Sequence, residues 1–138
     1  ALVNSAIERI KANNAPPIDF PKEIHALENL DPTIWEVLNH ELGHLKNSVD
    51  GKPLILLFIP NPYDFDYRKA LGKPSLVQEK IKATCDSLGI VYVDLLETMP
   101  SEDAKSFYLK NDDHFNKLGD KTATEILIKK LREHNIIQ

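Results

Sequence analysis

This sequence is short of cysteine, of long apolar runs and of clustered basic residues, and each shortage excludes something. Cys85 is the only cysteine, so the chain cannot form an internal disulfide, although one cysteine does not identify a compartment. The longest apolar run, PLILLFIP at 53–60, is too short to span a bilayer as a helix. The net charge is −4 with no basic stripe, which argues against nucleic acid as a partner, because that binding depends on clustered Lys and Arg.

What is present fits one folded domain, which we expect to comprise 1–138. The 138 residues are 42% hydrophobic and 28% charged, enough to build a core. Asp31-Pro32 is a strong helix start, and Gly89 is a typical C-terminal cap. We predict helices over 2–13, 22–30, 32–48, 76–88 and 117–134, strands over 53–59 and 90–96, a short helical segment after Pro100, and loops over 61–67 and 108–115.

The two predicted strands indicate the fold class. Both are continuous apolar runs, which is typical of strands buried on both faces of a parallel sheet. With the helix between them they form a β-α-β unit, which implies parallel strands and a right-handed crossover. The fold class is therefore α/β. Two strands make a poor sheet, so either further strands are missed here or the native sheet continues into chain that this sequence lacks.

The stretch HELGHLKNSVD at 40–50 has zinc-ligand spacing. His40 and His44 share one face of a helix, and Glu41 would be the general base for a zinc-bound water. The stretch resembles the metzincin pattern HExxHxxGxxH, with Asn47 at the Gly position and Asp50 at the last ligand position. This resemblance implies a zinc metalloprotease.

Sequence context weighs against that interpretation. A buried strand follows Asp50, whereas metzincins continue with a mostly irregular subdomain. The helix also has an apolar stripe that explains it without a metal, and the two histidines fall on its polar side. The stripe comprises Ile34, Leu38, Leu42, Leu45 and Val49.

The stretch NDDHFNKLGDKTATEIL at 111–127 is more informative, because it places acidic residues and a histidine in a loop before an amphipathic helix. Here the chain resembles the SGNH, or GDSL-type, hydrolase family, which ends with Asp and His on a loop before its last helix. PLILLFIPNP and LGIVYVDLLETM resemble the strands that precede this loop in the family. The resemblance covers roughly residues 33–135, and the histidine loop is its specific part.

The resemblance implies acyl transfer by a Ser-His-Asp triad without a metal or other cofactor, on a small-molecule or carbohydrate ester. His114 matches the general base. Asn111 departs from the D-x-x-H form, whereas Asp112 has the D-x-H spacing. Residues two apart in an extended segment point to the same side, so Asp112 is expected to reach His114, and Asp113 to point away. The neighbouring Phe107, Tyr108 and Phe115 suggest an apolar wall.

The family's Gly-Asp-Ser nucleophile motif is missing, as are the Gly and Asn that donate to the oxyanion. The expected fold is therefore a parallel-sheet, three-layer domain of SGNH or flavodoxin-like type that lacks its N-terminal strand and nucleophile. On this interpretation the chain is the C-terminal portion of an esterase or acyltransferase. Its partner is then the missing N-terminal segment of the same protein. A third hypothesis is a non-catalytic α/β binding module.

Overall fold

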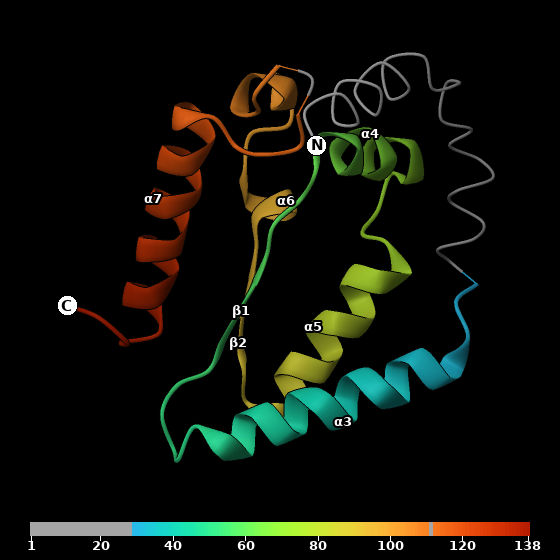
Figure 1. Cartoon of the computed structure of the whole chain (residues 1–138), viewed down its shortest axis with the longest axis vertical. Helices are drawn as coiled ribbons and strands as arrows, with labels where there is room; N and C mark the ends of the chain where they lie inside the picture. Colours follow the sequence, from blue (N-terminus) through green and yellow to red (C-terminus); the bar gives the residue numbers. More distant parts are fainter. Residues whose placement is uncertain (1–28, 111) are drawn as a thin grey trace, which may run out of the picture.

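The computed structural model describes residues 29–110 and 112–138 (Figure 1). The helices predicted over 2–13 and 22–30, and Asn111, lie outside the described residues. The described part is a mixed α/β structure with a two-stranded parallel sheet. No helix in these two ranges combines the length and the apolar character that crossing a membrane requires.

Helix α3 (Pro32–Ser48) confirms the helix predicted over 32–48. The Asp31 carboxylate accepts a hydrogen bond from the backbone N–H of Thr33 at 2.9 Å, and Pro32 begins the first turn, so the start signal acts as expected. The predicted apolar stripe is only partly correct. Leu42 is buried, whereas Ile34 and Leu45 are 45% and 52% exposed, because α3 packs along one line of contact on α5.

The two strands β1 (Ile55–Phe58) and β2 (Val91–Asp94) pair in parallel, with Ile55 opposite Val91 and Phe58 opposite Asp94. This confirms the predicted β-α-β unit and its parallel strands. The strand predicted over 90–96 is wrong at its end. The Asp94 carboxylate accepts from the backbone N–H of Glu97 at 3.1 Å, so Asp94 caps helix α6 (Leu95–Thr98) instead of extending the strand.

The crossover contains two helices, α4 (Pro62–Leu71) and α5 (Leu76–Leu88). The loop predicted over 61–67 is therefore wrong. Asn61 and Asp64 form a reciprocal capping box, and Gly72 ends the helix in the left-handed conformation at φ 68°. The 76–88 helix is confirmed as α5, with Ser75 as its N-cap and Gly89 at its end.

Both faces of the sheet are covered by helices, as Figure 1 shows with α7 on one side of the strands and α5 and α3 on the other. Leu57 and Val93 belong to a core cluster that includes Leu127 of α7. Leu56 and Tyr92, the next residues along each strand, belong to a second cluster with Leu42 of α3 and Cys85 of α5. The alternation explains why both strands are apolar up to Asp94 at the end of β2.

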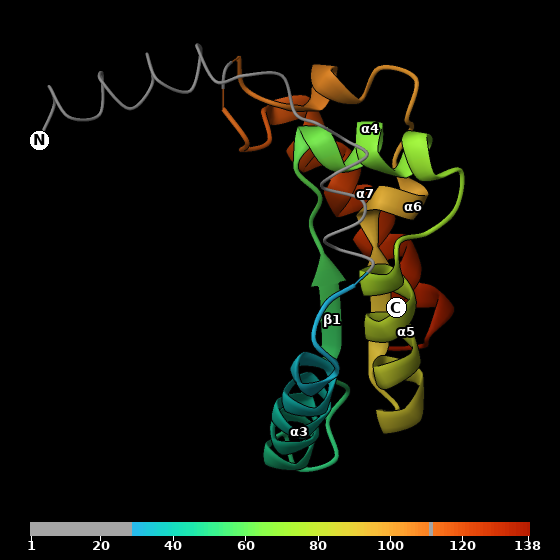
Figure 2. The same ribbon diagram turned by 90° about the vertical axis from the view of Figure 1, so that its right-hand side faces the viewer.

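The last part of the chain returns to the carboxyl end of the strands. It comprises the short helix η1 (Ala104–Phe107), a loop and α7 (Lys117–Glu133), which confirms the helix predicted over 117–134. Figure 2 shows α4 and α6 beyond this same end of the sheet. In open parallel sheets, ligands bind at the carboxyl edge.

Candidate functional site

The loop between η1 and α7 is closed by backbone hydrogen bonds between its two ends, which we call its neck. Tyr108 and Phe115 pair as an isolated antiparallel bridge. The Leu109 N–H donates to the His114 carbonyl at 2.9 Å, and the Asn116 N–H donates to the Phe107 carbonyl at 2.8 Å. The loop is therefore closed by its own backbone.

Asn116 ties this neck to the last helix. Its side-chain N–H groups donate to the carbonyls of Ser106 and Tyr108 at 2.7 and 2.9 Å. Its side-chain oxygen accepts from the backbone N–H groups of Leu118 and Gly119, which makes Asn116 the N-cap of α7. One side chain thus forms hydrogen bonds both with carbonyls of the loop and with N–H groups of the first turn of α7.

Aromatic packing joins the loop to the carboxyl end of β1. The Tyr108 hydroxyl donates to the Pro60 carbonyl at 2.8 Å, and the Tyr108 and Phe115 rings lie 5.0 Å apart. Phe107 and Tyr108 are buried and Phe115 is half-buried. The aromatic residues therefore anchor the loop within the core, and the apolar wall predicted beside His114 is not what they form.

Asp112 and His114 contact each other directly. Asp112 Oδ1 lies 2.5 Å from His114 Nδ1, and the same oxygen accepts from the His114 backbone N–H at 3.0 Å. The His114 side chain is 86% exposed, against 34% for Asp112. With Nδ1 on the carboxylate, the Nε2 atom on the opposite edge of the ring is directed away from Asp112.

The electrostatics of the loop favour a protonated imidazole. The hydrogen bond that His114 donates to Asp112 raises the pKa of His114 above its ordinary value, and the charges of Asp112 and then Asp113 add to the rise. Asp64 of α4 also interacts electrostatically with Asp113, and burial raises the pKa of Asp64. The carboxylates that act on His114 are therefore those of its own loop, Asp112 and Asp113.

Four of the five serines among the described residues are used locally, and the fifth is Ser101. The hydroxyls of Ser48, Ser87 and Ser106 each donate to a backbone carbonyl three residues earlier. Ser75 caps α5. Within residues 29–110 and 112–138, no serine hydroxyl is hydrogen-bonded to His114. The nucleophile that the family resemblance requires is thus not identified in this part of the chain.

The side chains of His40, Glu41 and His44 are exposed on α3, a helix that lies at the opposite end of the sheet from the loop before α7 (Figure 1). His40 Nε2 and His44 Nε2 lie 3.2 Å apart, and His40 Nδ1 lies 3.2 Å from Glu41 Oε1. Asp50 follows the helix with φ 50° and does not complete a ligand set with the two histidines. In the described ranges, no three His, Cys, Asp or Glu side chains are gathered as metal ligands.

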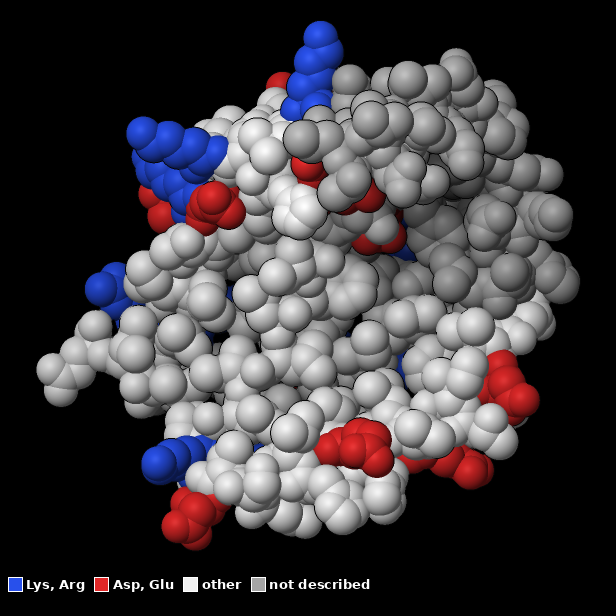
Figure 3. Space-filling view, viewed as in Figure 1, with Lys and Arg blue, Asp and Glu red and all other residues white. Residues whose placement is uncertain are grey.

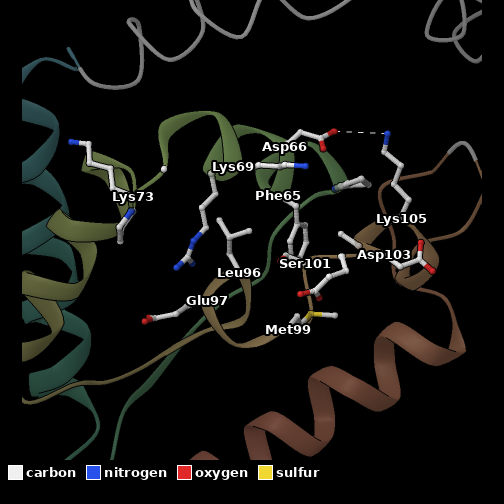
Figure 4. Close-up of a pocket in the computed structure, with 16 residues that line it drawn as sticks. Phe65, Asp66, Lys69, Lys73, Leu96, Glu97, Met99, Ser101, Asp103 and Lys105 are labelled. Carbon is white, nitrogen blue, oxygen red and sulfur yellow. Dashed lines mark ion pairs between the residues drawn. The ribbon is translucent and has the colours of Figure 1, made fainter.

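A hollow of about 740 Å³ lies between α4, α6 and the segment 101–105, at the same edge of the sheet as the His114 loop (Figure 4). Asp66 and Lys105 form an ion pair across it at 3.8 Å. Arg68 Nη1 is buried without a hydrogen-bond partner among the described residues. His114 and Asp112 do not line this hollow, and its wall carries acidic and basic side chains together.

Sequence reasoning missed three contributors to this edge of the sheet. The hollow depends on α4, and its start was signalled by Asn61-Pro62 followed by Asp64, a capping-box spacing. Gly119 lies in the stretch quoted for 111–127, but the sequence does not show why a glycine is needed there. In the fold, a Cβ at this position would overlap the Phe107 carbonyl oxygen. The Tyr108 hydroxyl bond to Pro60 spans 48 residues and leaves no local signal.

The space-filling view in Figure 3 shows the charges on one face. Among the described residues, basic side chains on this face lie apart and beside acidic ones, with no continuous basic stripe. Comparison with protein-family models, with curated proteins and with solved structures found no match to this chain.

Proposed function

We propose that this chain supplies the histidine and aspartate of a Ser-His-Asp acyl-transfer site of SGNH type, in an esterase or acyltransferase. The observation that supports the proposal is the Asp112–His114 contact at 2.5 Å, on a loop tied to the carboxyl edge of a parallel sheet. Helices on both faces of the sheet agree with the expected three-layer SGNH arrangement, in which further strands would extend this sheet.

The roles follow from the ring geometry. Asp112 accepts the hydrogen on Nδ1, which leaves the lone pair on Nε2 to take the proton of a serine hydroxyl as that oxygen attacks an ester carbonyl. The resulting imidazolium is stabilised by Asp112 and then gives its proton to the leaving alkoxide. The 86% exposure of His114 leaves Nε2 open to a serine from the segment that we propose precedes this chain.

The test compares the 138-residue chain with the same chain joined to its native upstream sequence. We expect the joined protein to hydrolyse p-nitrophenyl acetate, and His114→Ala to lower kcat by roughly 10³-fold or more, because loss of a triad member removes proton transfer. We expect the 138-residue chain alone to show no turnover. His134→Ala is the matched control, since His134 is also exposed but lies at the end of α7.

Four results would contradict this proposal in different ways. Turnover by the isolated chain that His114→Ala abolishes would place the nucleophile within these residues. Activity of the joined protein that is unchanged in His114→Ala would assign catalysis elsewhere, and no esterase activity at all would favour a binding module. Peptide-bond cleavage lost in His44→Ala would favour the zinc-protease hypothesis with His40, Glu41, His44 and Asp50.

A further inference from the structure

Two histidines of α3 lie with their outer nitrogens facing each other. His40 and His44 are four residues apart on the helix, their ring centroids are 4.3 Å apart, and the Nε2 atoms are separated by 3.2 Å. Both side chains are on the exposed part of α3. Neither histidine has a role in the proposed acyl transfer.

The separation matches that of two nitrogen ligands on one metal ion. A zinc–nitrogen bond is about 2.0–2.1 Å long, so two such bonds at a tetrahedral angle place their nitrogens roughly 3.3 Å apart. The two Nε2 atoms already stand at 3.2 Å. At this distance one ring donates a hydrogen bond to the other, and a metal ion would replace that shared hydrogen with little change in the separation of the two nitrogens.

Glu41 supplies the support that metal-binding histidines usually have. Its Oε1 lies 3.2 Å from His40 Nδ1, so the carboxylate accepts the Nδ1 hydrogen and leaves the lone pair on Nε2. A carboxylate on the second ring nitrogen fixes the tautomer and makes the ligating nitrogen more basic. The glutamate thus orients His40 toward the point where the ion would lie.

The helix itself keeps the two rings in place. Leu42, between the two histidines in sequence, is buried against α5 in the cluster that contains Cys85, so this turn of α3 is fixed to the core. The His40 and Glu41 side chains are each 67% exposed, which leaves the remaining coordination positions open to water. The site is pre-formed and accessible.

We propose that His40 and His44 bind one divalent transition-metal ion, with Glu41 as the supporting carboxylate. Imidazole nitrogen selects Cu²⁺, Ni²⁺ or Zn²⁺ over Mg²⁺ and Ca²⁺, and Cu²⁺ is the tightest of these ions. The site is distinct from a zinc-protease centre, since Asp50 does not join the two histidines. It requires no upstream sequence and does not depend on the proposed acyl transfer.

The test is calorimetric titration of the whole 138-residue chain with Cu²⁺, Zn²⁺ and Mg²⁺ in a buffer that does not bind metals. We expect Cu²⁺ and Zn²⁺ to bind, with Cu²⁺ tighter, and Mg²⁺ not to bind. His44→Ala should weaken Cu²⁺ binding by at least 10-fold, whereas His134→Ala, on another exposed histidine, should leave it unchanged. Alanine at an exposed helical position is compatible with α3, and circular dichroism verifies that each variant is folded.

A second pair of variants distinguishes the hydrogen bond of Glu41 to His40 from the effect of a negative charge elsewhere on α3. Glu41→Ala should weaken Cu²⁺ binding roughly 10-fold, because the support of His40 Nδ1 is lost. Glu36→Ala removes the same charge five residues earlier on α3 and should change affinity much less. The proposal is overturned if His44→Ala binds Cu²⁺ as tightly as the parent chain, or if the parent binds neither Cu²⁺ nor Zn²⁺. His114→Ala tests the other exposed histidine beside a carboxylate, and loss of Cu²⁺ binding there would move the site to the loop.

Discussion

The contact between Asp112 and His114 forms for a different reason than the sequence suggested. The expectation was an extended segment in which residues two apart share a side. Instead the Asp112 carboxylate accepts both the backbone N–H and the Nδ1 hydrogen of His114, so the backbone bends into an Asx-type turn. The carboxylate therefore fixes the position of the backbone and of the ring at once.

Asp112→Asn should lower the pKa of His114. The carboxylate stabilises the charged imidazole, so its folded-state pKa lies above the ordinary value of about 6.5 and falls back when the charge is removed. The stabilisation that Asp112 provides is therefore complete below about pH 6.5 and is lost as the pH rises through the folded-state pKa.

An NMR titration of the His114 Cε1 proton measures this change directly. Asp113→Asn is the matched control, because Asp113 acts on His114 only through its charge and contributes least of the causes that raise the pKa. We expect a larger fall for Asp112→Asn than for Asp113→Asn. Equal pKa values in the parent and Asp112→Asn would show that the contact does not persist in solution.

At the scale of elements, residues that cap a helix predicted where several helices begin. Asp31 caps a helix as expected, and Ser75 and Asn116 cap theirs in the same way, because a cap depends on residues within one turn. The same signal at Asn61 was overlooked because NPYDFDY carries no clear apolar stripe. β2 was predicted too long, since Leu95 and Leu96 are buried in α6 and are as apolar as strand residues.

The two residues of the candidate site could be predicted from the sequence, but the hydrogen bonds that position their loop could not. Asp112 and His114 were found because their spacing is short. The bonds that position them, from Tyr108 to Pro60 and from Asn116 to Ser106, join residues that only the folded chain brings together. The hollow bounded by α4 was out of reach for the same reason, since its wall combines three separate segments.

Asn116→Ala should destabilise the protein by about 2 kcal/mol, since removal of an N-cap typically costs about 1 kcal/mol and two loop carbonyls also lose their donor. Urea unfolding followed by circular dichroism gives the free energy of unfolding. Asn39→Ala, at an exposed interior position of α3, is the control and should change stability by less than about 0.5 kcal/mol. Equal midpoints for the two variants would contradict the role given to Asn116.

Glycine to alanine should have opposite effects in two helices. At Gly119 the added Cβ would overlap the Phe107 carbonyl oxygen and lie 2.9 Å from the Phe115 ring, so α7 must move away from the loop. We expect Gly119→Ala to cost about 1–3 kcal/mol. At Gly43 the nearest atom to a new Cβ is 4.0 Å away, so Gly43→Ala should stabilise α3 by up to about 1 kcal/mol.

Thermal denaturation of both glycine variants checks this pair of predictions. A higher melting temperature for Gly43→Ala and a lower one for Gly119→Ala is the expected result. If Gly119→Ala melts at or above the parent temperature, the close approach between α7 and the loop is not needed. In the protein joined to its upstream sequence, Gly119→Ala should also lower esterase activity, because the same carbonyl lies at the neck of the His114 loop.

At the scale of the whole molecule, the sheet joins two core clusters. One contains Leu95 and Val93 with α7, and the other contains Leu42 and Cys85 with α3 and α5. Because Leu56 and Tyr92 belong to one cluster and the adjacent Leu57 and Val93 to the other, loss of either cluster exposes one face of the sheet. A two-stranded sheet has little stability of its own. The two clusters should therefore unfold together.

Unfolding followed by two probes tests this coupling. Trp35, the single tryptophan, lies on α3 and reports the second cluster, whereas far-ultraviolet circular dichroism reports all helices. Leu95→Ala and Leu42→Ala should each cost about 2–4 kcal/mol, since both side chains are buried, and each should shift the fluorescence and dichroism midpoints in urea equally. Val37→Ala, at a side chain that is 61% exposed, is the control and should shift neither by much. If Leu42→Ala moves the Trp35 transition to lower urea and leaves the dichroism midpoint in place, α3 and α5 form a separate unit and the single-domain interpretation is wrong.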